Sequence, residues 1–270
     1  MHIDMVLGGL LVGILVGLTG IGGGSLLAPA LVAFFGVGPL NAVGTALFVK
    51  AAMKSLALVG HIQAREINYK VGGLLIAGAA PSAVAAVIVL IVFDYVDFPV
   101  ERWAHWMLAG IALLAGAATL LHPLYSYRFQ DADVRVLASL KVRITAIIVV
   151  GVVTGGLLAL TAIGGSALAI PMLGFLYLMP QKRIAGTDAF LTAIVAVSAG
   201  LFHAVGGNIS WVVAANVSIG AMPGLLLGLW LTRRRVLPEV LSRTVLGVLV
   251  ASMGIQMLVS LFRGGETPVS

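Results

Sequence analysis

Gly20-Ile21-Gly22-Gly23-Gly24-Ser25, followed by Pro29, interrupts an apolar segment that runs from Met5 to Phe35. Glycine and proline both interrupt helices. In lipid, an unwound backbone leaves N–H and C=O groups without partners, so a break of this kind survives only where protein encloses it. The stretch therefore predicts a broken membrane segment whose backbone lines a cavity inside the protein.

The same interruption returns as Ala162-Ile163-Gly164-Gly165-Ser166, ahead of Pro171, at an offset of 142 residues (171 − 29 = 142). Further pairs at this offset are Thr19 with Thr161, Gly44 with Gly186, Thr45 with Thr187, Phe48 with Phe190, His61 with His203, Ile67 with Ile209, Gly78 with Gly220 and Pro81 with Pro223. A rare histidine and two prolines do not match at one offset by chance, so we predict an internal duplication. Paired breaks in two halves point to the substrate site of a transporter.

The composition is that of a polytopic membrane protein. Of 270 residues, 60% are hydrophobic and only 10% are charged. The net charge of +6 comes from basic residues scattered between apolar runs, where they set topology, so it is no nucleic-acid signal. The absence of cysteine excludes disulfides, thiolate chemistry and Cys-ligated metals. The N-terminus Met1-His2-Ile3-Asp4 lacks the positive region of a cleaved signal peptide, so we expect the first apolar segment to stay.

We expect one all-α integral membrane domain built from two repeats, residues 1–127 and 144–270, joined by a polar cytoplasmic linker over residues 128–143. Each repeat should contain a glycine-broken re-entrant unit and three transmembrane helices. The arms of the first unit, about 15 residues before Gly20 and about 11 after Gly24, are each short for a span of about 20.

The basic loops decide between two topologies. If every apolar unit crosses once, Lys182-Arg183 and Arg233–Arg235 face outside, against the positive-inside rule. If the broken units enter and leave on one side and the N-terminus lies outside, all four basic loops become cytoplasmic, including Arg65–Lys70 and Arg128–Arg143. Each half then crosses three times, which makes the two repeats inverted.

The glycine breaks predict a cradle for a small oxyanion. A helix N-terminus after glycine-rich backbone offers free N–H groups and partial positive charge, and hydroxyls can add donors. The predicted substrate-binding residues are Gly22, Gly23, Gly24, Ser25, Thr45, Lys50, Gly164, Gly165, Ser166 and Thr187. Alternatively, the glycines only allow close helix packing, and the threonines bond back to their own helical turns.

Charged residues lie well inside two of the apolar segments. Lys50 and Lys54 are four apart and share a helical face. A lysine at mid-membrane costs about 2.5–3.5 kcal/mol, so it normally faces a cavity or a partner. We expect Lys50, near mid-helix, to attract an anion and Lys54 to extend toward the interface. Asp188 is a coupling site or an ion-pair partner, with Lys50 as the first candidate.

His61 and His203 occupy equivalent positions near helix ends, where they act as pH-sensitive gates or as interfacial caps. The sequence contains no HExxH, GxSxG or paired-carboxylate pattern, so it predicts no catalytic residue, no metal site and no cofactor.

The run Gly17-Leu18-Thr19-Gly20-Ile21-Gly22-Gly23-Gly24-Ser25 with Pro29, followed by Val43-Gly44-Thr45, resembles the TauE/SafE family of sulfite exporters and related permeases. The similarity extends from about Met5 to Phe262, and a weaker copy stands at Ile163–Ser166 with Ala185-Gly186-Thr187. The resemblance implies a bacterial-type inner-membrane transporter of small anions such as sulfite, sulfoacetate or related organosulfur compounds. Because the second copy has Ala162 for Gly20 and Ser166 for Gly24, we expect its backbone to be less open.

We therefore expect export of a small sulfur-containing anion across the cytoplasmic (inner) membrane, with the anion and the lipid bilayer as partners and no nucleic acid. An inside-negative potential favours anion efflux by about 2.3 kcal/mol per charge per 100 mV, so export needs no coupling ion. The alternatives are a proton-coupled importer that uses Asp188, a non-selective anion channel, and a membrane scaffold without transport.

Overall fold

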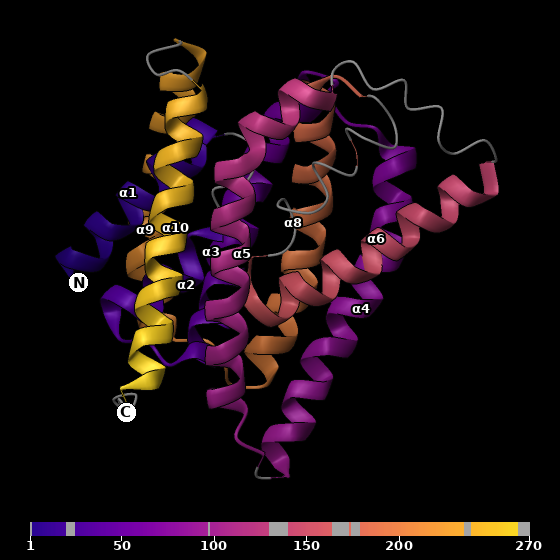
Figure 1. The fold of residues 1–270 in the computed structure, drawn as a ribbon. Helices are drawn as coiled ribbons and strands as arrows, with labels where there is room; N and C mark the ends of the chain where they lie inside the picture. The colour runs from indigo at the N-terminus through magenta and orange to yellow at the C-terminus, as the bar shows by residue number, and fades with distance from the viewer. Residues whose placement is uncertain are drawn as a thin grey trace.

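The structure, a computed structural model, describes residues 2–19, 25–96, 98–129, 140–163, 173, 179–234 and 239–263. In these ranges the secondary structure is helical, without strands (Figure 1). The helices are α1 (Ile3–Thr19), α2 (Leu27–Phe35), α3 (Pro39–Gln63), α4 (Tyr69–Tyr95), α5 (Val100–Phe129), α6 (Leu140–Thr161), α8 (Gln181–Val205), α9 (Trp211–Arg233) and α10 (Glu239–Phe262).

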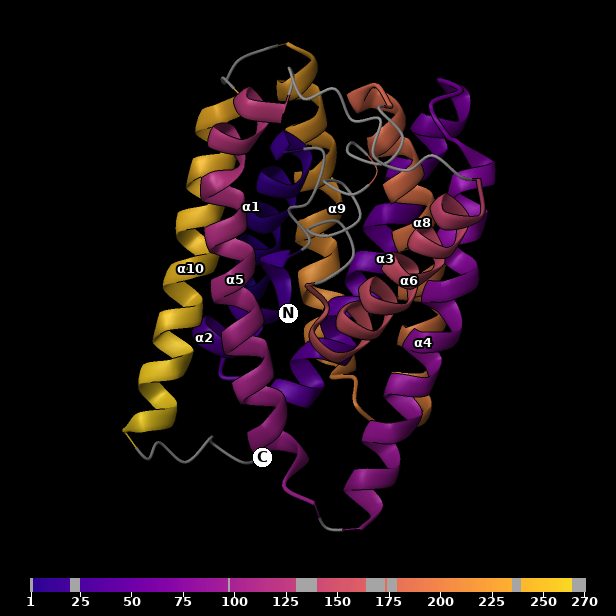
Figure 2. The same cartoon turned by 45° about the vertical axis from the view of Figure 1, so that its right-hand side comes forward.

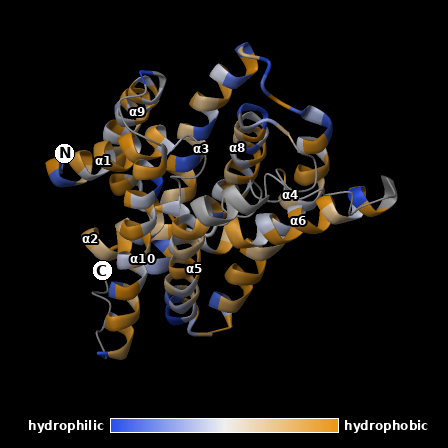
Figure 3. Cartoon of the chain, turned by 45° about the horizontal axis from the view of Figure 1, so that its top comes forward, coloured by the Kyte–Doolittle hydropathy of each residue, from blue (hydrophilic) through white to orange (hydrophobic). Residues whose placement is uncertain are grey.

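Seven of the described helices are long and apolar enough to cross a bilayer, which confirms the predicted all-α polytopic class. They are α3, α4, α5, α6, α8, α9 and α10. The first broken unit consists of two shorter pieces, since α1 has 17 residues and α2 has 9, where a full span needs about 20. Hydrophobic residues cover most of the helix lengths (Figure 3).

Local signals set where the helices begin and end. Pro39 opens α3, where its missing N–H is no loss. The Glu101 carboxylate accepts a hydrogen bond from the backbone N–H of Leu40 at 3.3 Å, and so caps α3 from a distant segment. Asn68 caps α4 by accepting from the N–H of Val71 at 3.3 Å. Gly36 ends α2 in the left-handed conformation, with φ 62°.

Two close helix pairs each join one helix of the first half to one helix of the second. A Cβ on Gly9 or Gly13 of α1 would meet the carbonyl oxygen of Val217 or Ala221 of α9, each at 2.3 Å. Glycine is therefore required for these backbones to approach so closely. Residue numbers rise together along α1 and α9, so the two helices are parallel.

The equivalent pair is α4 with α6. A Cβ on Gly151 would lie 2.3 Å from the carbonyl oxygen of Leu75, and one on Gly155 would lie 2.1 Å from that of Ala79. These four residues stand 142 positions from the α1 and α9 residues that make the matching contacts (151 − 9 = 142; 217 − 75 = 142). The two helix pairs are thus built from the same contacts with the halves exchanged.

Helices α3 and α8 are antiparallel. Gly44, near the start of α3, lies against the carbonyl of Asn208 beyond the end of α8, and Gly186, near the start of α8, lies against that of Glu66 beyond the end of α3. Helix α9 follows α8 after a short turn and runs antiparallel to it, so α9 runs in the same direction as α3. Since α1 is parallel to α9, α1 and α3 also run in the same direction (Figures 1 and 2). The chain therefore returns between Thr19 and Pro39, and α2 forms part of that return.

The described parts of the basic segments lie at one end of the bundle. This end holds the turn between α3 and α4, the starts of α6 and α8, and the end of α9 (Figure 1). The turns between α4 and α5 and between α8 and α9 lie at the opposite end.

The duplication appears in the helix bounds and in the side-chain contacts. Helices α3 and α8 differ by 142 residues at both ends (181 − 39 = 142; 205 − 63 = 142). Phe48 packs edge-on against Trp211 with ring centroids 5.4 Å apart, and Phe190 packs against Tyr69 at 5.5 Å, both with interplanar angles of 78°. The same contacts are thus made twice with partners exchanged, and the inverted arrangement of the two repeats stays a prediction. The division into domains and the placement of the two halves in a bilayer stay predictions.

Candidate functional site

The predicted site lies where α1 and α6 end. Both helices end in a buried threonine whose hydroxyl donates to a carbonyl one turn earlier, from Thr19 to Leu15 at 2.9 Å and from Thr161 to Leu157 at 2.7 Å. Ser25, beyond the first break, is buried as well. The other predicted residues of the breaks, Gly22, Gly23, Gly24, Gly164, Gly165 and Ser166, lie outside the described residues.

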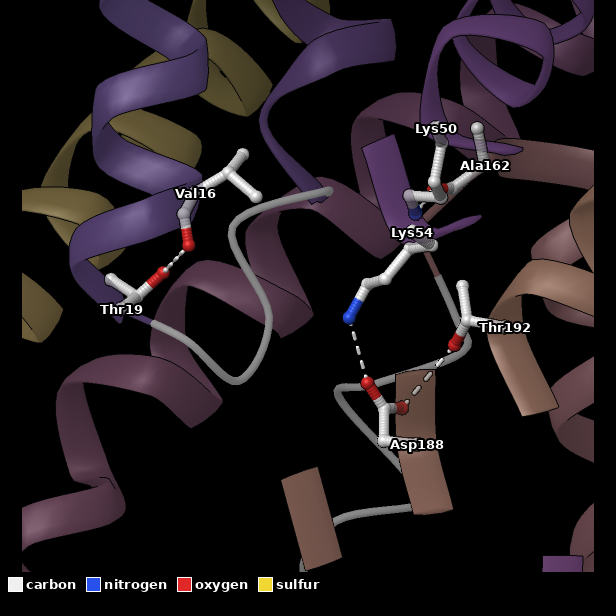
Figure 4. A network of polar contacts seen from close by, with 7 residues as sticks. All are labelled: Val16, Thr19, Lys50, Lys54, Ala162, Asp188 and Thr192. Carbon is white, nitrogen blue, oxygen red and sulfur yellow. Dashed lines mark hydrogen bonds and ion pairs between the residues drawn. The ribbon is translucent and has the colours of Figure 1, made fainter. Parts of the chain in front are cut away.

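Lys50 extends from the middle of α3 to the end of α6. The residue is only 4% exposed, and its ammonium donates a hydrogen bond to the backbone carbonyl of Ala162 (Figure 4). Ala162 directly follows α6 and has a left-handed backbone, with φ 56°. The ammonium therefore lies at the carbonyl end of α6, where the helix dipole carries partial negative charge.

Lys54, one turn further along α3, forms an ion pair with Asp188 of α8. Its Nζ lies 2.8 Å from Oδ2 of Asp188, and the Thr192 hydroxyl donates to Oδ1 at 3.3 Å (Figure 4). The expectation that Asp188 neutralises Lys50 is thus corrected, because antiparallel packing brings Asp188 level with Lys54. Lys54 does not extend to the interface either, since it is 7% exposed and held inside by this pair.

The two buried lysines of α3 differ in their partners. Lys54 is compensated by Asp188, whereas no carboxylate of the described chain lies within 4.0 Å of the Lys50 ammonium. A carbonyl oxygen supplies only part of a charge. In a medium of low dielectric constant, a buried ammonium without a counter-ion attracts an anion strongly. The arrangement of Lys50 beside the Lys54–Asp188 pair is suited to bind one small anion next to Lys50.

The two equivalent histidines have different environments. His203 is fully buried, and its Nε2 lies 3.0 Å from the carbonyl oxygen of Ala159 in the last turn of α6. His61 is half-buried, with Nδ1 2.8 Å from Oε2 of Glu66. His203 is enclosed by α6 and α3, and the reading as an interfacial cap stays a prediction for both histidines. A gating role stays a prediction for both.

The two predicted threonines join the halves. The Thr45 hydroxyl accepts a hydrogen bond from the N–H of Ser210, and that of Thr187 accepts one from the N–H of Asn68, both at 3.0 Å. The Thr187 hydroxyl also donates to the carbonyl of Arg183, one turn earlier in α8, at 2.7 Å. This is the bond to its own helical turn that was given above as the alternative to substrate binding. Both residues are fully buried, and substrate contact stays a prediction for them.

Sequence analysis missed Thr192 and the role of the Ala162 carbonyl. Thr192 is the repeat equivalent of Lys50 (192 − 50 = 142), so the offset alone would have pointed to it. Ala162 carries no chemical signal, because its contribution is a backbone oxygen. Across the described ranges, no three His, Asp or Glu side chains gather in a way that could hold a metal ion.

Comparison with known proteins identifies related membrane proteins. The family model for the sulfite exporter TauE/SafE matches residues 5–257. The probable membrane transporter protein YjnA of Bacillus subtilis is 34% identical over 235 residues, which cover 87% of this chain and 91% of that protein. YunE of the same organism, another probable membrane transporter protein, is 26% identical over 241 residues, covering 85% and 88%. The probable membrane transporter protein MJ0441 of Methanocaldococcus jannaschii is 30% identical over 217 residues, covering 78% and 72%. No solved structure gives a significant match.

Proposed function

The chain belongs to the TauE/SafE family of membrane transporters, and from this premise we propose that it exports a small sulfur-containing anion across the cytoplasmic membrane. Sulfite, sulfoacetate and related organosulfonates are the substrate class. The observation that carries the proposal is Lys50, an ammonium buried beside the end of a broken helix without a carboxylate partner among the described residues.

The arrangement of charge supports an anion rather than a cation as substrate. Asp188 is held by Lys54 and Thr192, so the buried carboxylate is already committed to protein partners. The Lys50 ammonium has only a carbonyl acceptor in the described chain and can form a stronger, charge-assisted bond to an oxyanion. The hydroxyl of Ser25 and the glycine breaks, which include Gly23 and Gly165, are proposed to supply the remaining donors.

The basic segments support a cytoplasmic assignment for one end of the bundle. The turn that carries Arg65, the Lys182-Arg183 pair and the end of α9 at Arg234 share that end. Under the positive-inside rule this end faces the cytoplasm, and the N-terminus faces outside. An inside-negative potential then drives an anion outward by about 2.3 kcal/mol per charge per 100 mV.

The test is efflux of labelled sulfite from proteoliposomes, with and without an imposed potential and pH gradient. We expect saturable, potential-driven flux that related sulfonates compete for. Lys50→Gln should lower this flux about tenfold or more, since a hydrogen bond to a charged group contributes about 1.5–3 kcal/mol. Lys70→Gln, which removes an exposed lysine from the start of α4, is the matched control and should stay close to wild type.

The other outcomes identify the alternatives. Flux that requires a proton gradient would indicate a coupled importer and turn attention to Asp188. Flux that does not saturate would indicate an anion channel. No flux of sulfite under any gradient would remove the substrate assignment, and wild-type flux in Lys50→Gln would remove Lys50 from the site.

A further inference from the structure

The turn after α6 combines three features at one residue. Ala162 is fully buried, its backbone is left-handed with φ 56°, and its carbonyl is the acceptor for the Lys50 ammonium. A side chain with a Cβ rarely adopts this conformation, which glycine adopts freely. The repeat equivalent of Ala162 is Gly20 (162 − 20 = 142), so the less favourable residue stands in the copy that contacts Lys50.

We propose that the carbonyl oxygen of Ala162 occupies the position that an oxygen of the transported anion takes on Lys50, so that anion binding and the left-handed turn at Ala162 exclude one another. The inference rests on the proposed function, and it assigns residue 162 to the substrate site through its backbone. In this state the protein's own carbonyl holds the place of the substrate.

Electrostatics explains why the two acceptors compete. The carbonyl of Ala162 accepts from the Lys50 ammonium and directly follows α6, whose last carbonyls form the negative end of the helix dipole. An anion that binds the same ammonium meets these carbonyl oxygens at close range and is repelled by them. The carbonyl of Ala162 must therefore turn away before an oxyanion can take its place.

Two hydrogen bonds hold the chain on either side of Ala162. One turn earlier, the carbonyl of Ala159 is held by His203 of α8 at 3.0 Å. The Thr161 hydroxyl also accepts from the N–H of Ile163 at 3.2 Å. His203 therefore anchors the last turn of α6, directly before Ala162.

The first test is Ala162→Gly in the sulfite efflux assay. Glycine stabilises the left-handed turn relative to alanine, so it should hold the carbonyl on Lys50 more firmly and raise the KM for sulfite about fivefold or more. Ala146→Gly is the control, because it removes the same methyl group from the first part of α6, where the backbone is helical. The control should not raise the KM.

The second test leaves Ala162 unchanged. The chain contains no cysteine, so a single introduced thiol reports alone. Ile163 is 2% exposed, and Ile147, near the start of α6, is 1% exposed. Sulfite should increase the rate of thiol labelling of Ile163→Cys several-fold and leave that of Ile147→Cys unchanged. If Ala162→Gly does not fold, this measurement alone decides.

The two proposals fail in different ways. Saturable sulfite flux in the wild type, with an unchanged KM in Ala162→Gly or with unchanged labelling of Ile163→Cys, overturns the exclusion and leaves the exporter standing. Absence of saturable sulfite flux in the wild type overturns the proposed function and the exclusion with it.

Discussion

Replacing Asp188 by asparagine removes the carboxylate that faces Lys54 at 2.8 Å, and we expect the free energy of unfolding to fall by about 3–5 kcal/mol. The loss is large because the ammonium of Lys54, a residue only 7% exposed, is left without a counter-ion in an apolar interior. Lys54→Met should cost a similar amount, since it leaves the buried Asp188 carboxylate without its ammonium partner. The double variant Lys54→Met/Asp188→Leu should lie within about 1.5 kcal/mol of wild type, because both charges are gone and volume is roughly kept.

Equilibrium unfolding of the purified protein in detergent micelles measures these four stabilities. Lys50→Met is the control on the same helix face. It removes a buried ammonium that has no carboxylate partner in the described chain, so stability should change by less than about 1 kcal/mol while sulfite transport is lost. The ion pair does not stabilise the packing of α3 on α8 if the free energy of unfolding of Asp188→Asn lies within about 1 kcal/mol of the wild-type value. The same conclusion follows if the double variant is less stable than both single variants.

Three further changes probe the contacts between the halves and the topology. Gly186→Ala places a Cβ 2.5 Å from a backbone carbonyl oxygen and should lower the free energy of unfolding by about 1–3 kcal/mol. Gly60→Ala is the control, since a Cβ there meets nothing within 4 Å, and it should raise the free energy of unfolding by up to about 1 kcal/mol. Equal stability of the two variants would contradict the close approach at Gly186. Thr187→Val should lose about 1–3 kcal/mol in the same assay, because it leaves the N–H at the start of α4 unpaired, and an unchanged stability would show that water replaces the hydroxyl. In whole cells, an impermeant thiol reagent should label Tyr95→Cys, which is 89% exposed, and not Ala64→Cys in the turn at the basic end; the reverse pattern would invert the topology.

The sequence was sufficient to predict the helical class and the duplication, but not which helices pair. Histidine and proline are rare in apolar segments, so their recurrence at one offset indicated which segment of the second half corresponds to α3, namely α8. The glycines of α1 signalled only that some backbone approaches closely. They did not identify α9 as the partner, because a stripe such as Gly9 and Gly13 fits any helix with small or open positions opposite. Partner choice depends on the arrangement of the whole bundle.

The candidate site, too, could be predicted from the sequence only in part. Lys50, Lys54 and Asp188 stood out because charges in apolar segments are costly and must have a reason. Their pairing could not be predicted, since position along a helix says nothing of the register between antiparallel neighbours. The Ala162 carbonyl had no signal at all, because every residue has that group and only the fold decides which one lies beside Lys50.

The exchange of helices between the halves has a consequence for biosynthesis. The glycine stripe of α1 is complete by Thr19, but its partner α9 ends only at Arg233, 214 residues later (233 − 19 = 214). At about 5–20 residues per second, ribosomes need on the order of 10–40 s to make that interval. Throughout this time α1 has emerged without the surface it fits, so lipid or the insertion machinery must shield it. The first half cannot complete its own packing, and a chain truncated before α9 is a target for membrane quality control.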